Sequence, residues 1–189
     1  HCFACRISIV VAAKSLFMTP IRILVLTPWV PYPITGACQQ DRWHGLVQMQ
    51  KMGYKIHVIA KIHDWQPQAE IEDIFSRQGI DLTLVPYNKN VISLGVKMLK
   101  EILCTPALLD GAALEFADPY YIKIVREIAQ KFSPDVAWIE YTLLWPVMRE
   151  MKKMGIPVIM KSALNEPANC RDEHSWSLSS IVKSLPKYL

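Results

Sequence analysis

The sequence predicts an α/β fold: a doubly wound parallel sheet with helices on both faces. From residue 21 onward, short apolar runs of strand length alternate with segments whose apolar residues recur at helical spacing. The first apolar run also ends in a proline-rich loop that reaches Gly36 before a helix begins, which is typical of the first βα turn of such a sheet. Strands that alternate with helices run in one direction, so both faces of the sheet are expected to be covered.

Turn and cap residues separate the predicted elements. Gly53, Gly79 and Gly155 each follow a helical pattern and favour its termination. Asp118 and Pro119 form a good N-cap and first-turn pair. The predicted strands are residues 21–27, 55–60, 82–85, 136–139 and 157–161, and the predicted helices are 38–52 (burying Trp43, Leu46 and Val47), 69–78, 119–132 and 143–154, with a helical tail over 173–189.

Composition suits one globular domain. The chain has 189 residues, of which 51% are hydrophobic and 20% charged. A net charge of +4 with scattered lysines and arginines gives no reason to expect a nucleic-acid partner. Five dispersed cysteines form no disulfide framework and favour a reducing, cytoplasmic compartment. The Cys2-x-x-Cys5 spacing is interpreted as chance, because a metal site would need a second ligand pair.

Both ends of the chain suggest a piece of a longer protein. The first residue is His1, whereas Met18 lies immediately before the first strand, so residues 1–17 are expected to be a leader or a non-native extension. Their apolar part contains Lys14 and is too short to span a bilayer. Residues 18–189 then form the domain, which is expected to be truncated because the chain ends inside a helical pattern.

The loop after the first strand has two interpretations. The sequence contains neither a G-x-G-x-x-G motif nor a phosphate-loop lysine motif, so the usual dinucleotide and triphosphate loops are not expected. In one interpretation the prolines stiffen the connection while Trp29 and Tyr32 pack over the sheet edge. In the other, Gly36 lets the backbone approach a ligand, and the first amides of the next helix face a phosphate.

Several segments together resemble the N-terminal domain of glycosyltransferase family 4, which has a GT-B fold. That family opens with a strand, a T-P-x-x-P-Y-P loop, a double glycine, and a helix closing with R/K-x-G-H-x-V. The match covers about residues 21–167. The similar segments are 22–33, Gly36, 50–59, 134–141 (family pattern P-D-V-V-H-V-H/E), 155–159 (G-I-P-V-V) and 165–167 (part of H-N-x-E). The chain departs from the family at Ala37, Trp138, Glu140, Ala163 and Leu164.

The resemblance implies one half of a two-domain enzyme. It implies that this Rossmann-like domain receives a glycan or lipid-linked acceptor, while an absent C-terminal Rossmann domain holds the nucleotide-sugar through a Glu-x7-Glu signature. The implied activity is retaining, hexosyltransferase-like transfer in polysaccharide biosynthesis, without a bound metal or other cofactor. Its implied location is the cytoplasm, with peripheral contact at the inner face of a membrane. The chain alone is expected to be inactive. The alternative is a non-catalytic glycan- or nucleotide-binding module of the same fold.

The resemblance also assigns roles to individual residues. Glu140 stands where the family often has a catalytic histidine, and Gly36 and Ala37 are expected at the donor phosphate. Trp29, Tyr141, Asn165 and Glu166 are expected to line the acceptor cleft.

Each assignment has a simpler alternative. A carboxylate just past a buried strand lies at the carboxyl edge of the sheet, where it can orient or deprotonate a hydroxyl. Equally, Glu140 can cap the helix that starts near Thr142, and Asn165 with Glu166 can form a turn before Pro167.

The histidines suggest no metal site. His57 is expected inside a strand as a satisfied core or edge residue, and His44 on a solvent-facing helix surface. His63 and His174 are expected in loops without partners. The apolar stripe 92–103 is expected to pack on the sheet, with a membrane surface as its alternative.

Overall fold

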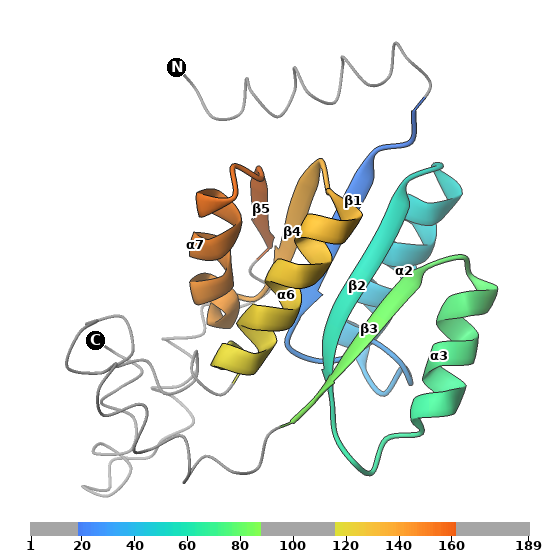
Figure 1. Ribbon diagram of the computed structural model, residues 1–189. Helices are drawn as coiled ribbons and strands as arrows, with labels where there is room; N and C mark the ends of the chain where they lie inside the picture. Colours follow the sequence, from blue (N-terminus) through green and yellow to red (C-terminus); the bar gives the residue numbers. More distant parts are fainter. Residues whose placement is uncertain (1–18, 88–115, 162–189) are drawn as a thin grey trace, which may run out of the picture.

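The structure is a computed structural model that describes residues 19–87 and 116–161 (Figure 1). Its centre is a five-stranded, all-parallel sheet in the order β3-β2-β1-β4-β5. The predicted doubly wound, Rossmann-like fold is therefore confirmed. The strands are β1 (Arg22–Thr27), β2 (Lys55–Ile62), β3 (Asp81–Pro86), β4 (Val136–Glu140) and β5 (Val158–Lys161). The expected leader, the stripe 92–103, the tail 173–189, and the site residues Asn165 and Glu166 lie outside the described residues.

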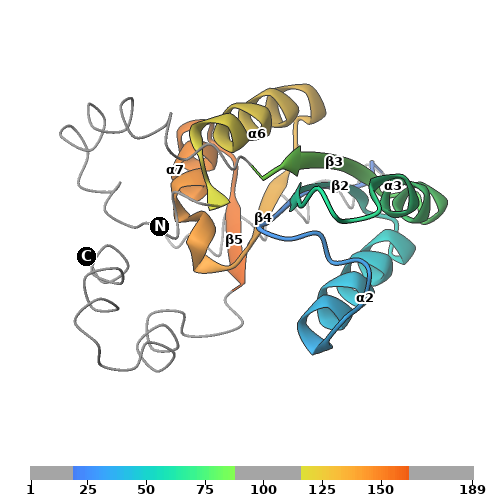
Figure 2. The same ribbon diagram turned by 90° about the horizontal axis from the view of Figure 1, so that it is seen from below.

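Helices cover both faces of this sheet. Helices α2 (Ala37–Lys51) and α3 (Gln68–Arg77) pack on one face, and α6 (Pro119–Phe132) and α7 (Trp145–Lys153) pack on the other (Figures 1 and 2). Each face has its own apolar core. Leu46, Val58 and Phe75 belong to the core under α2 and α3, while Leu24, Val125 and Val147 belong to the core under α6 and α7.

Several predicted boundaries differ from the observed ones, most of them by one residue, and three of these differences bear on the site. Strand β2 continues two residues beyond the predicted end, to Ile62. Strand β4 includes Glu140, which pairs in register with Lys161 of β5. The predicted helix 143–154 begins instead with a 3-10 turn, η2 (Thr142–Leu144), before α7 starts.

The predicted start of α6 is confirmed. The Asp118 side chain accepts hydrogen bonds from the backbone amides of Tyr120 (2.8 Å) and Tyr121 (2.9 Å), and Pro119 occupies the first turn. The other carboxylate oxygen of Asp118 is paired with the buried ammonium of Lys61 on β2. The cap therefore also joins α6 to the end of β2.

The strand order places a switch in winding direction between β1 and β4. Strand β1 pairs with β2 on one side and with β4 on the other, with Leu26 opposite both Ile59 and Ile139. Their carboxyl ends consequently lie together. In open α/β sheets, ligands bind at this point.

Substitution of two glycines tests the backbone conformations assigned to them. Gly53 has φ +86°, where an L-residue is strained, whereas Gly45 lies inside α2 with open space where a Cβ would be added. We expect Gly53→Ala to lower the free energy of unfolding by about 1–2 kcal/mol and Gly45→Ala to raise it by about 0.5–1 kcal/mol. Urea denaturation measures both. Equal effects of the two substitutions would contradict the assigned conformations.

Candidate functional site

A pocket of about 180 Å³ lies at the carboxyl edge of the sheet, beside the switch point. The first turns of α2 form one wall, and the ends of β4 and β5 form the other. Its lining residues are Ala37, Cys38, Asp41 and Arg42 from α2, with Glu140, Tyr141 and Lys161 from the sheet edge.

Arg42 is the central polar residue of this pocket. It is only 6% exposed, and its guanidinium donates to the Cys38 carbonyl (3.2 Å), to Thr27 Oγ1 (3.3 Å) and to the Tyr141 hydroxyl (3.0 Å). Its Nε also lies 3.3 Å from Glu140 Oε2. One side chain therefore connects α2 to the ends of both β1 and β4.

Glu140 is a buried carboxylate with spare acceptor capacity. The residue is 7% exposed, and within the described part of the chain its Oε2 accepts no hydrogen bond, although it faces the Arg42 cation. Burial raises the pKa of Glu140 to about 7, and the charges of Arg42 and Lys161 partly oppose that rise. A carboxylate that titrates near neutral pH can accept a proton from a ligand hydroxyl. Such a group in a cleft is also a functional-site candidate.

Tyr141 follows Glu140 in a strained backbone conformation. Its φ is 70°, which is rare for a residue with a bulky side chain. The ring lies edge-on to Trp29 (centroids 5.2 Å apart) and under the Arg42 guanidinium (4.9 Å). Surrounding contacts thus hold the strained residue, an arrangement that clusters at ligand-binding sites.

An ion pair borders the open side of the pocket. Lys161 Nζ at the end of β5 pairs with the Asp41 carboxylate of α2. This hydrogen bond and charge lower the pKa of Asp41. Both side chains are accessible to solvent, so the pair contributes little stability and leaves the entrance free to rearrange.

The structure brings part of the predicted site together. Glu140, Tyr141 and Ala37 line one pocket, and Gly36 is the N-cap of α2 beside it. Gly36 has φ −169°, an extended conformation that any residue adopts, so its backbone does not require glycine. Trp29 packs behind the ring of Tyr141 and is not a lining residue.

The simpler interpretation of Glu140 as a helix cap is not supported by its contacts. The N-cap position of η2 is Tyr141, which makes no capping hydrogen bond through its side chain. Glu140 Oε2 lies against Arg42 of α2 instead.

The sequence alone predicts no role in the site for four lining residues: Cys38, Asp41, Arg42 and Lys161. A signal for Arg42 was present. It lies four residues before Leu46, so it shares the helix face that packs on the sheet. An arginine on a buried stripe needs partners, and the nearest strand ends supply them.

The predicted surroundings of the histidines are confirmed in part. His57 is a satisfied residue inside β2, with Nε2 2.8 Å from Thr83 Oγ1, and burial lowers its pKa. His44 is exposed on α2 as expected. The expectation that His63 has no partner is wrong, because its ring stacks on Tyr87 and Trp65. His174 lies outside the described residues. Across 19–87 and 116–161, no group of three metal-ligating side chains is gathered.

No protein-family model and no curated protein matches this chain. Among the helices described, none has the length and apolar character needed to span a bilayer.

The buried ion pair can be tested by removing its cation. We expect Arg42→Met to lower the free energy of unfolding at pH 8 by about 3 kcal/mol, because it leaves the Glu140 charge buried without a partner. Arg77→Met is the matched control: its pair with Asp73 is exposed, so the change should be under about 1 kcal/mol. Adding Glu140→Gln to Arg42→Met should restore part of the loss. Additive effects in this double-mutant cycle would show that the two side chains do not interact.

The raised pKa of Glu140 predicts a pH-dependent stability. The folded protein holds this proton up to about pH 7, whereas the unfolded chain releases it near 4.5. Stability from this group is therefore present below pH 4.5 and lost as the pH rises to 7, by at most about 1.4 kcal/mol per pH unit. The Glu140→Gln variant has no such group to titrate. Its free energy of unfolding should therefore rise relative to that of the wild type between pH 5 and pH 8.

Glu150→Gln is the control for that pH series. Hydrogen bonds from Lys153 and Arg126 lower the pKa of Glu150, so this group stays ionised from pH 5 to pH 8. The stability difference between Glu150→Gln and the wild type should then be constant over the range. A constant difference for Glu140→Gln as well would contradict the raised pKa.

Proposed function

We propose that this chain is the acceptor-side domain of a retaining glycosyltransferase. The enzyme would move a sugar from a nucleotide-sugar to a hydroxyl of a glycan or lipid-linked acceptor in polysaccharide biosynthesis. The donor would be held by a second Rossmann-like domain, so the chain by itself is expected to be inactive. A lipid-linked acceptor would place the enzyme at the cytoplasmic face of a membrane.

The observation that carries the proposal is the state of Glu140. It combines a buried carboxylate, an Oε2 atom without a hydrogen-bond donor in the described structure, and a pKa of about 7. These properties suit a group that receives a hydroxyl and removes its proton. A carboxylate needed only for folding would gain by filling its acceptor positions.

The position of the pocket supports the same reaction class. It lies where parallel strands change winding direction, beside the N-terminus of α2. Two of the segments that resemble glycosyltransferase family 4, the loop ending at Gly36 and residues 134–141, meet at this edge. Free amides at the start of a helix suit a donor phosphate near Gly36 and Ala37.

The proposed transfer forms one bond, breaks one bond and moves one proton. An acceptor hydroxyl oxygen forms a bond to the anomeric carbon of the sugar, on the face from which the diphosphate departs. The bond from that carbon to the diphosphate breaks, and the nucleoside diphosphate leaves with the electron pair. Ionised Glu140 takes the hydroxyl proton, and its charge also stabilises positive charge developing on the sugar carbon.

Turnover of the complete gene product tests the role of Glu140. We expect Glu140→Gln to reduce nucleotide-sugar turnover by about 100-fold or more, since an amide cannot accept the proton. The assay measures the nucleoside diphosphate released from UDP- and GDP-sugars in the presence of a crude glycan and lipid acceptor fraction. Glu127→Gln, an exposed change on α6, should leave turnover unaltered. Wild-type turnover by a folded Glu140→Gln variant would refute the catalytic role.

A non-catalytic module that binds a glycan or nucleotide remains the second candidate. The same free acceptor atom and pocket would hold a ligand hydroxyl without any bond being broken. The coding sequence distinguishes the two candidates. Continuation into a second α/β domain with glutamates in a Glu-x7-Glu spacing favours the enzyme, and a stop codon directly after Leu189 favours the module.

A further inference from the structure

A row of aromatic rings follows the carboxyl edge of the sheet away from the pocket. Neighbouring ring centroids are 4.1–6.0 Å apart along the whole row. The rings in order are Tyr141, Trp29, Phe116, Tyr87, His63 and Trp65. Tyr141 and Phe116 are buried, whereas the other four reach solvent to different degrees. The row therefore connects the lining of the pocket to the molecular surface beyond β2 and β3.

The outer end of this row is a stack of three nearly parallel rings. His63 lies flat on Tyr87, with centroids 4.1 Å apart and planes at 2°, and faces Trp65 at 5.6 Å and 14°. The indole of Trp65 is 76% exposed. An exposed tryptophan that stays aligned with its neighbours offers an apolar face at little further cost in conformational entropy.

The turn that presents Trp65 is held by its own hydrogen bonds. The backbone amide of Gln66 donates to the His63 carbonyl (3.0 Å), and the His63 amide donates to the Gln66 side-chain oxygen (2.9 Å). At the inner end, Tyr87 lies over the Lys61 ammonium (5.0 Å), which is itself paired with Asp118. These contacts order the turn and the inner ring of the stack without a ligand, which lowers the entropy cost of binding there.

We propose that Trp65, His63 and Tyr87 form a stacking subsite for the outer sugar rings of an extended saccharide whose reacting end lies at Glu140. This inference rests on the proposed function and specifies its acceptor as an oligosaccharide rather than a single sugar. Sugar rings carry apolar C–H faces and a rim of hydroxyls, so they stack on aromatic faces while their polar groups stay in water.

The surroundings of the stack favour a saccharide over a protein partner. Trp65 is the one exposed large apolar side chain of the loop between β2 and α3, and the side chains beside it, Asp64 and Gln66, are polar. Protein partners typically need a contiguous apolar patch of several hundred Å². A narrow aromatic face with polar borders instead matches the amphipathic cross-section of a sugar chain. The ring contacts from Trp65 to Tyr141 place the stack and the pocket along the same edge of the sheet, so a saccharide that follows this edge would run from Trp65 towards Glu140.

Binding measurements on the full 189-residue chain test the subsite. The probes are maltohexaose, cellohexaose and chitohexaose, each compared with its monosaccharide by NMR titration. We expect at least one hexasaccharide to bind more tightly than its monosaccharide, and Trp65→Ala to weaken it by about 3- to 10-fold. Trp65→Phe should keep most of the affinity, because it keeps a ring.

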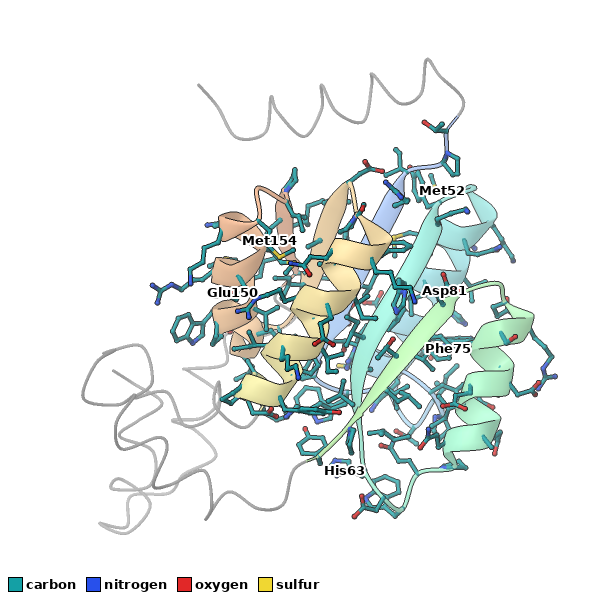
Figure 3. All side chains as sticks on the ribbon, in the orientation of Figure 1. Met52, His63, Phe75, Asp81, Glu150 and Met154 are labelled. Carbon is teal, nitrogen blue, oxygen red and sulfur yellow. The ribbon has the colours of Figure 1, made fainter. Side chains whose placement is uncertain are left out.

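Met52→Ala is the matched control. Met52 is also a large exposed apolar side chain (67%), but it lies at the opposite edge of the sheet from His63 (Figure 3). Its loss should leave hexasaccharide binding unchanged. Because Trp65 and Met52 are exposed, both variants are expected to fold, and thermal unfolding checks this.

The outcomes separate this inference from the proposed function. One outcome is that a hexasaccharide binds and shifts the NMR signal of Glu140, but the Trp65→Ala variant binds it equally well. The proposed subsite is then refuted while the proposed function stands. If no saccharide binds while the complete gene product still turns over nucleotide-sugars, the subsite alone is again refuted. Binding of UDP or GDP through Trp65, in place of any saccharide, would assign the stack to a nucleobase and also overturn the inference.

Discussion

The hydrogen bonds and the ion pair of Arg42 hold together the carboxyl edge of the sheet, on which the pocket depends. A parallel sheet brings the ends of β1 and β4 to one edge, but it does not fix the side chains that project from them. The Arg42 guanidinium does so by reaching Thr27, Tyr141 and the Glu140 carboxylate from α2. Because these partners lie at the ends of two different strands, β1 and β4, the pocket forms only when α2 is docked on the sheet.

The opposite face of the sheet uses the same device. Lys61, near the end of β2, is fully buried against α6 and paired with Asp118, the N-cap of that helix. Among residues 19–87 and 116–161, each face thus has an apolar core and one buried cation near the carboxyl edge. A buried charge is costly unless it is paired. Arg42 and Lys61 therefore favour the one placement of α2 and of α6 in which their partners are in reach. The rigidity of the edge then follows from polar contacts as much as from packing.

The sequence allowed the sheet and most helices to be predicted, because each strand is an apolar run bounded by turn residues. It did not reveal where charged residues are tolerated inside. The predicted strand 55–60 stops short of Lys61, whereas β2 continues through this buried lysine because Asp118, 57 positions away, is its partner. For Arg42, the position on the buried face of α2 is a local signal, but its partners at the ends of β1 and β4 are distant in sequence. Long-range pairing of this kind leaves no local pattern.

The candidate site was predictable only in outline. Glu140 was singled out through its resemblance and its place after an apolar strand, and the structure adds its burial and its contact with Arg42. The aromatic stack at His63 could not be foreseen, because Trp65 and Tyr87 come from different loops whose approach depends on the pairing of β2 with β3. Residues that share no element are brought together only by the completed fold.

The backbone at Tyr141 has one more consequence. Along a regular strand, consecutive side chains point to opposite faces, so neighbouring residues cannot serve the same cavity. The positive φ of Tyr141 breaks that alternation where β4 ends, and both Glu140 and Tyr141 border one hollow and touch one guanidinium. One residue with a positive φ thereby lets two consecutive residues place a carboxylate and a phenol in the same pocket. With regular strand geometry, the second group would have to come from another segment of the chain.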